Sequence, residues 1–371
     1  MKIGVVTFFN VPNYGAMLQA YALWHYLELR GHEVEFIAHP FCAQKPIPLW
    51  KCFVSRHLKG VRNKLSGIVH HAITEFAKSY PKTRQFERYE ELAELKDRYD
   101  AVIVGSDQMW NPKWCGRPNC IELLFLGFAG EKTLKASYAA SFGTMHWSAE
   151  SVALRTGELL RLFKGISVRE ESGVKVVEEL SGRKDAVCLL DPTLLQTAKF
   201  YRSIAEKVQR ENYIFKYMLG WSDPNEADGV VQAVRDEKGM LEVLDDKTSV
   251  SGKLGLVSKV FGVKGKVSLP QWLGSIEQSR FVVTNSFHGT VFSILFHRPF
   301  VSLKIKGEMS GMNERAATLL KTVGLEDRFL YADDTVGIKR AVESEIDWSS
   351  VDEKLKTRRL DTDAFFASLG L

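Results

Sequence analysis

The strongest constraint on the fold is a repeated order of short apolar strand, polar loop and helix. At the amino end, Lys2–Phe8 is an apolar strand, Asn10–Gly15 is a loop of turn-forming residues, and Ala16–Leu29 places apolar residues at helical spacing. A second strand follows at Glu33–Ala38. Parallel strands need a crossover between them, so this order predicts a parallel βαβ unit.

The same order continues through both halves of the chain. Further strands are predicted at Asp100–Val104, Leu134–Ala140, Gly165–Val168, Val187–Leu190, Tyr213–Leu219, Met240–Leu244, Val257–Phe261, Arg280–Thr284 and Phe300–Lys304. Helices are predicted at Ser172–Leu180, Gln271–Gln278, Thr290–His297 and Asn313–Val323. Strands separated by helices predict an α/β fold, in which two doubly wound, Rossmann-like domains face a cleft.

The length of 371 residues exceeds that of one ordinary domain, which is about 100–200 residues. The composition becomes more polar and charged near residues 196–212. We therefore expect an N-terminal α/β domain at 1–205, a C-terminal α/β domain at 206–345 and a helical tail at 346–371.

Composition excludes several classes of protein. Hydrophobic residues make up 45% and charged residues 26%, which is typical of a folded globular chain. The five cysteines have no regular spacing, which favours free thiols in a reducing compartment and gives no metal-site pattern. The first residues do not resemble a signal peptide, and no stretch reaches about 18 apolar residues. We expect a cytoplasmic, soluble protein.

The net charge of +5 is too small to indicate nucleic acid as a partner, but it is unevenly distributed. Residues 51–88 hold nine lysines and arginines against two glutamates. This segment is either a solvated face or an arm that approaches anionic lipid headgroups or a diphosphate-linked glycan, with peripheral contact at the inner face of the membrane. The sequence does not indicate an oligomeric state.

His288 lies where the predicted strand Arg280–Thr284 turns through the polar loop Asn285–Gly289 into a helix. Ligands of open α/β sheets bind at the carboxyl ends of strands. Gly289 allows a ligand to approach the backbone, and the free amides at a helix start favour an anion. We predict an anion site with His288 as a proton-exchanging group. The alternative is that Ser286 caps the helix and His288 packs without a ligand.

Charged residues follow two other predicted strands. Arg169 and Glu170 end one of them, and an arginine there can clamp a carboxylate or phosphate, or form a surface ion pair. Lys304 and Lys306 stand at the end of another strand and point the same way, because side chains alternate along a strand. One of these lysines can reach an anion near His288, or both can be solvated.

Two polar loops lie at the same edge of the predicted N-terminal sheet. Asn13 and Tyr14 precede a helix that contains Gln19, and Ser106 and Asp107 follow a strand. These side chains can hold sugar hydroxyls. The alternative is ordinary helix capping by Asn13 and Ser106.

Taken together, these motifs resemble the polysaccharide pyruvyl transferase family. The resemblance covers roughly residues 1–330, and several motifs in order are more specific than any one of them. The matching segments are Asn13–Ala16, Leu18–Leu23, Val104–Asn111, Tyr138–Gly143, Ser167–Glu170, Asp191–Thr193 and the signature Thr284–Thr290.

The resemblance implies a fold like that of type B glycosyltransferases, with phosphoenolpyruvate in the cleft between the domains. The family's signature histidine corresponds to His288 and its strand-end arginine to Arg169. A basic residue after the next strand corresponds to Lys304, with Lys306 close by, and Arg315 resembles a further family arginine. The N-terminal domain is then the acceptor side, and the C-terminal domain carries the donor motif Ser286–Thr290.

The implied reaction joins a pyruvyl ketal to a sugar of a surface polysaccharide or its precursor and releases phosphate. It requires cations for the donor's carboxylate and phosphate and a group that moves a proton, but no cofactor. Arg169 and Lys304 then bind anions, His288 holds the donor and moves the proton, and Glu170 is a candidate general acid. Two alternatives share the fold: a nucleotide-sugar glycosyltransferase and a non-catalytic glycan-binding protein.

Overall fold

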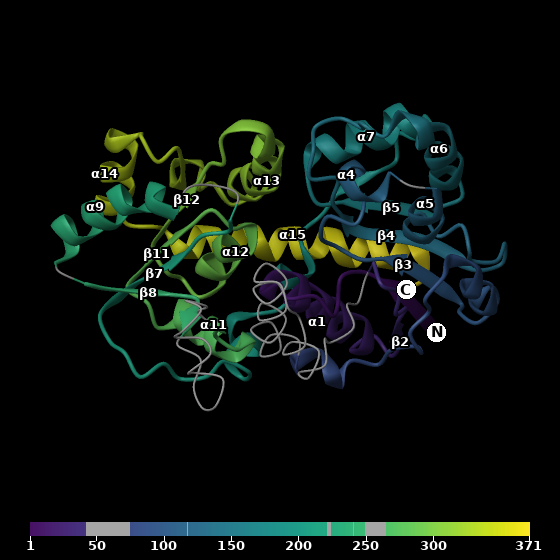
Figure 1. Cartoon of the computed structure of the whole chain (residues 1–371), viewed down its shortest axis with the longest axis horizontal. Helices are drawn as coiled ribbons and strands as arrows, with labels where there is room; N and C mark the ends of the chain where they lie inside the picture. The colour runs from purple at the N-terminus through teal and green to yellow at the C-terminus, as the bar shows by residue number, and fades with distance from the viewer. Residues whose placement is uncertain (42–74, 117, 221–223, 240, 249–264) are drawn as a thin grey trace, which may run out of the picture.

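Two parallel β-sheets organise the molecule, one in each of two lobes (Figure 1). The computed structural model describes residues 1–41, 75–116, 118–220, 224–239, 241–248 and 265–371. The first sheet lies before residue 189 and the second after residue 212, so the change of lobe falls in the polar stretch noted in the sequence.

The sheet of the N-terminal lobe has the order β2-β1-β3-β4-β5-β6, and every neighbouring pair is parallel. Its strands are β1 (Lys2–Val6), β2 (Glu33–Phe36), β3 (Ala101–Val104), β4 (Leu134–Ala140), β5 (Gly165–Val168) and β6 (Val187–Cys188). Its helices include α1 (Tyr14–Glu28), α4 (Pro112–Cys115), α5 (Pro118–Leu124), α6 (Ala153–Arg161) and α7 (Glu171–Ser181). This order confirms the predicted βαβ start.

The sheet of the C-terminal lobe has the order β13-β12-β11-β7-β8 and is also parallel. Its strands are β7 (Tyr213–Tyr217), β8 (Glu242–Asp245), β11 (Phe281–Thr284), β12 (Phe300–Leu303) and β13 (Phe329–Leu330). The helices are α8 (Ala198–Arg202), α9 (Asp228–Lys238), α11 (Leu269–Glu277), α12 (Phe287–Leu295), α13 (Asn313–Val323) and α14 (Thr335–Glu343). A short antiparallel pair, β9 (Lys247–Thr248) and β10 (Gly265–Lys266), lies beside this sheet.

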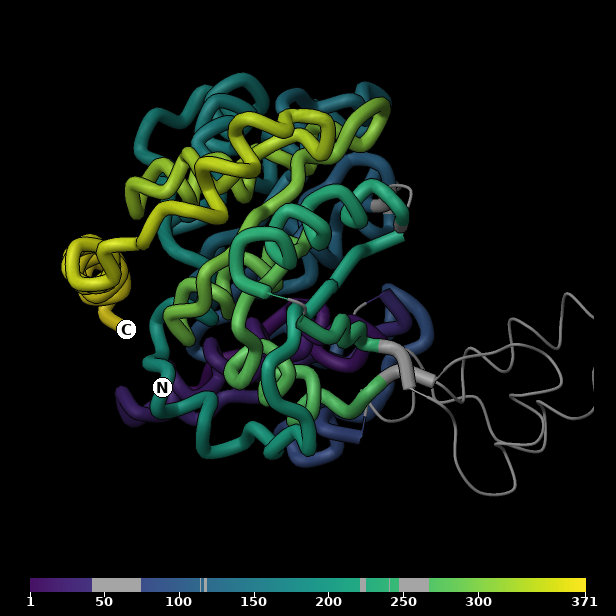
Figure 2. Tube along the Cα trace, turned by 90° about the vertical axis from the view of Figure 1, so that its left-hand side faces the viewer, coloured from purple at the N-terminus to yellow at the C-terminus, as the bar shows by residue number. Residues whose placement is uncertain are grey.

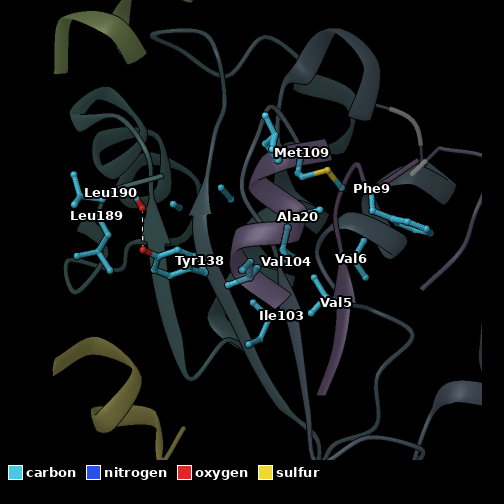
Figure 3. Packing of buried hydrophobic residues seen from close by; sticks show 14 of the residues in the cluster. Val5, Val6, Phe9, Ala20, Ile103, Val104, Met109, Tyr138, Leu189 and Leu190 are labelled. Atoms are coloured by element: carbon cyan, nitrogen blue, oxygen red, sulfur yellow. Dashed lines mark hydrogen bonds between the residues drawn. The ribbon is translucent and has the colours of Figure 1, made fainter. Parts of the chain in front are cut away.

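The core of the N-terminal lobe forms where α1 packs on the sheet (Figure 3). Val5, Val6, Ile103 and Val104 are fully buried, as expected for parallel strands that are covered on both faces. The Tyr138 hydroxyl donates to the Leu190 carbonyl at 2.9 Å, so the one polar group of that buried ring is satisfied.

A long carboxyl-terminal helix, α15 (Trp348–Leu369), crosses from the second lobe back to the first (Figure 1). In the side view it is seen end-on at the edge of the molecule, on the same side as both termini (Figure 2). Phe366 packs against the rings of Tyr26 and Tyr138, and the Tyr26 hydroxyl donates to Asp363 at 2.6 Å. The tail is a helix as predicted, and it completes the N-terminal lobe.

Several elements differ from the sequence expectation. The helix after β11 starts at Phe287 rather than Thr290, because the Ser286 side chain caps it and draws the predicted loop into the first turn. The predicted strand Met240–Leu244 is β8, and Val257–Phe261 lies outside the described residues. The sequence analysis did not predict α9, α14 or β13, which is only two residues long.

The basic segment 51–88 is described only from residue 75. There Lys78 pairs with Glu75, Arg84 with Glu91 and Glu94, and Arg88 with Glu91. In this part the cations are largely neutralised by neighbouring acids. The prediction of a lipid- or glycan-binding arm therefore depends on residues outside the described part.

We predict that Phe366→Ala lowers the free energy of unfolding by about 3–5 kcal/mol, because it opens a cavity between α15 and the first sheet. Leu360→Ala is the matched control on the same helix, because that side chain is 61% exposed, and we expect a change within about 0.5 kcal/mol. Urea unfolding measures both. Equal effects of the two substitutions would show that α15 is not part of the first core.

Candidate active site

The carboxyl ends of the two sheets face each other across a pocket of about 560 Å³, part of it open to solvent. Both lobes contribute to it, as expected for ligand sites of α/β folds. The pocket is lined by Asn13, Asp107 and Gln108 from the first lobe and by Leu219, Asn285, Ser286, Phe287, His288, Ser302, Leu303, Ile305, Met312, Asn313, Arg315, Ala316 and Phe329 from the second. Figure 1 shows α12 at the centre, where the lobes meet.

His288 lies in the first turn of α12 and is 7% exposed. Ser286 caps this helix, and its hydroxyl accepts from the Gly289 amide at 3.3 Å. A Cβ at Gly289 would overlap Thr284, so the glycine is required where the helix turns back over its strand. The predicted role of Gly289 in binding the donor is not tested. Its amide already serves the cap, and Gly289 does not line the pocket.

The carboxylate of Asp191 is the polar centre of the junction between the lobes. Its Oδ2 accepts from Arg169 Nη1 at 2.8 Å and from the Ser106 hydroxyl at 2.9 Å. Its Oδ1 accepts from the Thr193 amide and hydroxyl at 3.0 and 2.6 Å. Nε2 of His288, from the other lobe, lies 3.6 Å from Oδ2. The sequence analysis quoted Asp191 in a family motif but did not predict it as a site residue, although it directly follows a predicted strand.

Burial alone would raise the pKa of Asp191, but the opposing effects of His288, Arg169 and Thr193 are larger and hold the pKa well below its usual range. Asp191 is therefore ionised throughout the neutral range. It can accept hydrogen bonds but cannot donate them.

Arg169 is 3% exposed, so it does not form the surface ion pair that was the alternative for it. It bonds Asp191 and lies 3.4 Å from Asp107, with its guanidinium 4.5 Å from the centre of the Phe287 ring. A narrower hollow beside the main pocket is lined by Arg169 and Asp191 and shares Phe287 and Arg315 with that pocket.

Arg315 is 6% exposed and reaches the same aromatic ring, 5.9 Å from its centre. Among the residues that the structure describes, no carboxylate lies within ion-pair distance of its guanidinium, whose Nε donates weakly to the Met312 carbonyl at 3.4 Å. Burial and the charge of Arg169 lower the pKa of Arg315 to about 10. A buried cation without a counter-ion at a pocket wall marks a place for an anionic ligand.

Glu170 is fully buried behind the pocket and does not line it. Its Oε1 accepts from the Ser141 hydroxyl and from the amides of Phe142 and Gly143, while Oε2 is buried without a partner. Burial raises the pKa of Glu170, and the charge of Arg169 opposes that rise. The carboxyl group anchors the loop after β4, and its predicted role as general acid is not tested.

Lys304 and Lys306 follow β12 and point the same way, as predicted from strand alternation. Their ammonium groups lie 5.1 and 5.5 Å from the centre of the Tyr331 ring. Lys306 is exposed and pairs with Asp333 at 2.8 Å, whereas Lys304 also contacts the ring of Phe329, which lines the pocket. Lys304 is thus nearer the pocket wall, although it is not among the lining residues.

The five residues predicted to bind the acceptor separate into three groups. Asn13 caps α1 by accepting from the Ala16 amide, and Asn13 and Asp107 both line the pocket. Ser106 donates to Asp191. Tyr14 and Gln19 are buried away from the pocket.

Tyr14 and Gln19 each have partners inside the protein. The Tyr14 hydroxyl donates to the Val267 carbonyl at 2.8 Å, and its ring stacks on Trp272 in the other lobe. The Gln19 amide donates to Thr7 and to the Phe8 and Ala16 carbonyls. A spacing pattern cannot distinguish such buried groups from ligand-binding ones.

A sequence profile described as polysaccharide pyruvyl transferase matches residues 13–306. The chain belongs to this family. No curated protein matches the chain in sequence. Within the described residues, no helix has both the length and the apolar composition of a membrane span.

Solved structures of other proteins share the fold of this pyruvyl transferase family member. UDP-GlcNAc 2-epimerase from Methanocaldococcus jannaschii is 12% identical, with 98% of this chain and 99% of that chain covered and a TM-score of 0.52. A putative UDP-N-acetylglucosamine 2-epimerase from Listeria monocytogenes is 9% identical, with 96% and 90% covered and a TM-score of 0.52. At these identities the similarity shows the fold alone, which is the predicted type B arrangement of two lobes.

Gly15 provides a test of the site geometry, because a Cβ there would overlap the imidazole ring of His288. We predict that Gly15→Ala lowers kcat/KM of the transferase by about 10²-fold through displacement of His288. Gly229→Ala is the control, since nothing lies within 4 Å of its new methyl group in α9. We expect unchanged activity there and a stability gain of up to about 1 kcal/mol. Full activity of Gly15→Ala would contradict the contact.

Arg169→Met should lower the free energy of unfolding by about 3–5 kcal/mol near neutral pH, because it leaves the buried charge of Asp191 without the guanidinium that donates to it. The pKa of Asp191 is lowered in the fold, so the pairing contributes stability above the ordinary aspartate range and loses it as the pH falls. The difference in the free energy of unfolding between wild type and Arg169→Met should therefore shrink below about pH 4.

Urea unfolding at neutral and acidic pH measures this deficit, and Arg169→Lys, which keeps the charge, should lose less. A deficit that is equal at both pH values would argue against the charge pairing.

Proposed function

We propose that this protein transfers a pyruvyl group from phosphoenolpyruvate to two hydroxyls of a sugar, in a surface polysaccharide or its precursor, with release of phosphate. Family membership supports transfer of a pyruvyl group. The observation that carries the choice of donor is Arg315, a buried guanidinium at the pocket wall that has no carboxylate partner among the described residues.

Phosphoenolpyruvate carries a carboxylate and a phosphate on adjacent atoms, so its site needs several cationic or N–H donors close together. Arg315 and Arg169 approach the same ring of Phe287, and the amino end of α12 adds its positive dipole end. In this proposal Arg169, Arg315, Lys304 and His288 hold the donor.

The reaction is an addition followed by a displacement. One sugar hydroxyl forms a bond to the second carbon of the donor, and the methylene carbon gains a proton as the double bond is lost. A second hydroxyl then bonds to the same carbon, its proton is removed, and phosphate leaves with the electrons of its C–O bond. The methylene carbon is formally reduced and the second carbon is formally oxidised by the same amount, so the reaction needs no external oxidant or reductant and the proposal includes no redox cofactor. The proposal also assigns no metal. His288 moves the proton in the addition.

The acceptor enters from the N-terminal lobe, where Asn13 and Asp107 line the shared pocket. Asp107 accepts from the Gln108 amide at 2.8 Å and adopts a left-handed backbone conformation with φ of 70°. Because Asp107 lines the pocket that both lobes share, its carboxylate can accept from sugar hydroxyls there in this proposal. We further propose that the reaction occurs in the cytoplasm, on an acceptor that can be lipid-linked.

The first test is phosphate release from phosphoenolpyruvate with galactose-, glucose- and mannosamine-type acceptors. We expect release that depends on the acceptor and is lost in His288→Ala, with unfolding unchanged. No release with any acceptor, together with tight binding of a nucleotide sugar, would favour a glycosyltransferase. Sugar binding without any release would favour a non-catalytic protein.

Arg315→Met separates donor binding from stability. The substitution removes a buried cation whose charge is disfavoured in the fold, so the free energy of unfolding should stay equal or rise. The KM for phosphoenolpyruvate should increase by about 30–200-fold, since a charged hydrogen-bonding group contributes about 2–3 kcal/mol. Lys306→Met is the control, because Lys306 is exposed and paired outside the pocket. An unchanged donor KM in Arg315→Met would remove Arg315 from the donor site.

A further inference from the structure

The approach of Asp191 to His288 is a polar contact across the junction of the lobes. Asp191 follows β6 in the N-terminal lobe, while His288 belongs to α12 in the C-terminal lobe. Their atoms Oδ2 and Nε2 lie 3.6 Å apart, slightly beyond hydrogen-bond length. Such pairs are often longer without substrate and shorten when it binds.

The carboxylate of Asp191 has a fixed orientation. Ser106 and Arg169 donate to Oδ2, and both donors of Thr193 go to Oδ1. The carboxylate is fully buried and ionised. Because an ionised carboxylate only accepts hydrogen bonds, a favourable contact requires a hydrogen on Nε2 of the imidazole.

The two ring nitrogens of His288 have different surroundings. Nε2 is sealed from solvent and has no partner within hydrogen-bond distance, so Oδ2 of Asp191 is the acceptor placed to satisfy it. The Nδ1 side of the ring lies against Gly15, two residues after Asn13, which lines the same pocket as His288. His288 itself lines the pocket, so with Nε2 sealed, Nδ1 is the ring nitrogen left to meet a ligand beside the Gly15 backbone.

The charges around the ring explain why a carboxylate is needed. The guanidinium groups of Arg169 and Arg315 both reach the ring of Phe287, the residue before His288. A positive charge that develops on His288 during proton transfer is opposed by both cations. Asp191 is the carboxylate that approaches the imidazole, while Asp107 contacts Arg169 and Glu170 faces the loop after β4.

We propose that Asp191 is a positioning residue that holds His288 with its hydrogen on Nε2, so that Nδ1 takes the proton of the attacking sugar hydroxyl. This rests on the proposed function. In the addition, the O–H bond of the hydroxyl breaks and an N–H bond forms at Nδ1. The π electrons of the donor's double bond then take that proton from Nδ1 onto the methylene carbon as the hydroxyl oxygen bonds to the second carbon, so His288 ends unchanged. Asp191 keeps its charge throughout, and the Nε2–H bond is never broken.

The direct test is the ¹⁵N spectrum of protein labelled at its histidines, recorded at about pH 9, where ordinary imidazoles are neutral. His288 is one of nine histidines, and the signal lost in His288→Gln assigns it. We expect a protonated Nε2 and an unprotonated Nδ1. A wild-type His288 with its hydrogen on Nδ1 would overturn the proposal without any variant at Asp191.

Asp191→Asn should change the spectrum and the rate together. An asparagine lacks the negative charge that favours a hydrogen on Nε2, so the hydrogen should move to Nδ1. We expect kcat to fall by about 10²–10⁴-fold, as for a catalytic imidazole held in the wrong tautomer, with the donor KM changed less than about threefold. Asp333→Asn is the matched control, since it makes the same change of carboxylate to amide at an exposed residue paired with Lys306 outside the pocket, and its His288 tautomer and kcat should stay near wild type.

The readouts separate this inference from the proposed function. Absence of pyruvyl transfer in the wild type, together with the expected tautomer, would reject the function and keep the positioning role. An unchanged His288 tautomer in Asp191→Asn would reject the positioning role. So would an effect limited to a higher donor KM with kcat unchanged, because Asp191 would then only support Arg169. If Asp191→Asn does not fold, the wild-type spectrum still decides the question, because a hydrogen on Nδ1 of His288 would overturn the proposal.

Discussion

The contacts of one buried carboxylate connect most of the site. Asp191 receives Arg169 from the end of β5, Ser106 from the end of β3 and Thr193 from its own turn, and it faces His288 from the other lobe. A charge in this position is costly unless every lone pair is matched. The ends of three strands and the start of α12 must therefore be correct together, and a shift in any one of them disturbs the others.

The second constraint is positive charge that the fold does not neutralise. Arg169 has two aspartates, but Arg315 is buried beside it with no carboxylate within ion-pair distance among the described residues. A protein selected only for stability gains nothing from such an arrangement, because two guanidinium groups near one aromatic ring repel each other. The repulsion between these buried cations is expected where an anionic ligand completes the site. It distinguishes the pocket from the exposed ion pairs elsewhere on the surface.

The sequence predicted the repeated strand–helix order, the two sheets and the strand-end positions of His288 and Arg169. These follow from local patterns, since apolar runs and turn formers act over a few residues. It did not predict that Asp191 would join them, because that contact links positions 85, 22 and 97 residues away from it, which no local pattern records. It also could not separate Tyr14 and Gln19 from pocket residues, since a polar side chain in the first turns of a helix can face the protein interior or the pocket. The start of α12 was misplaced by three residues because Asn285–Gly289 was interpreted as a loop, although capping by Ser286 was the stated alternative.

The path of α15 has a consequence for how the molecule is made. The helix packs against Tyr26 and Tyr138 in the first lobe, yet the ribosome produces it after every strand of the second lobe. The first sheet therefore emerges with an apolar surface that stays uncovered until about 200 further residues have been added, which takes about 10–40 seconds at ordinary synthesis rates. During that interval the nascent first lobe is the part of the chain most in need of a chaperone, and its folding ends only when the last helix docks.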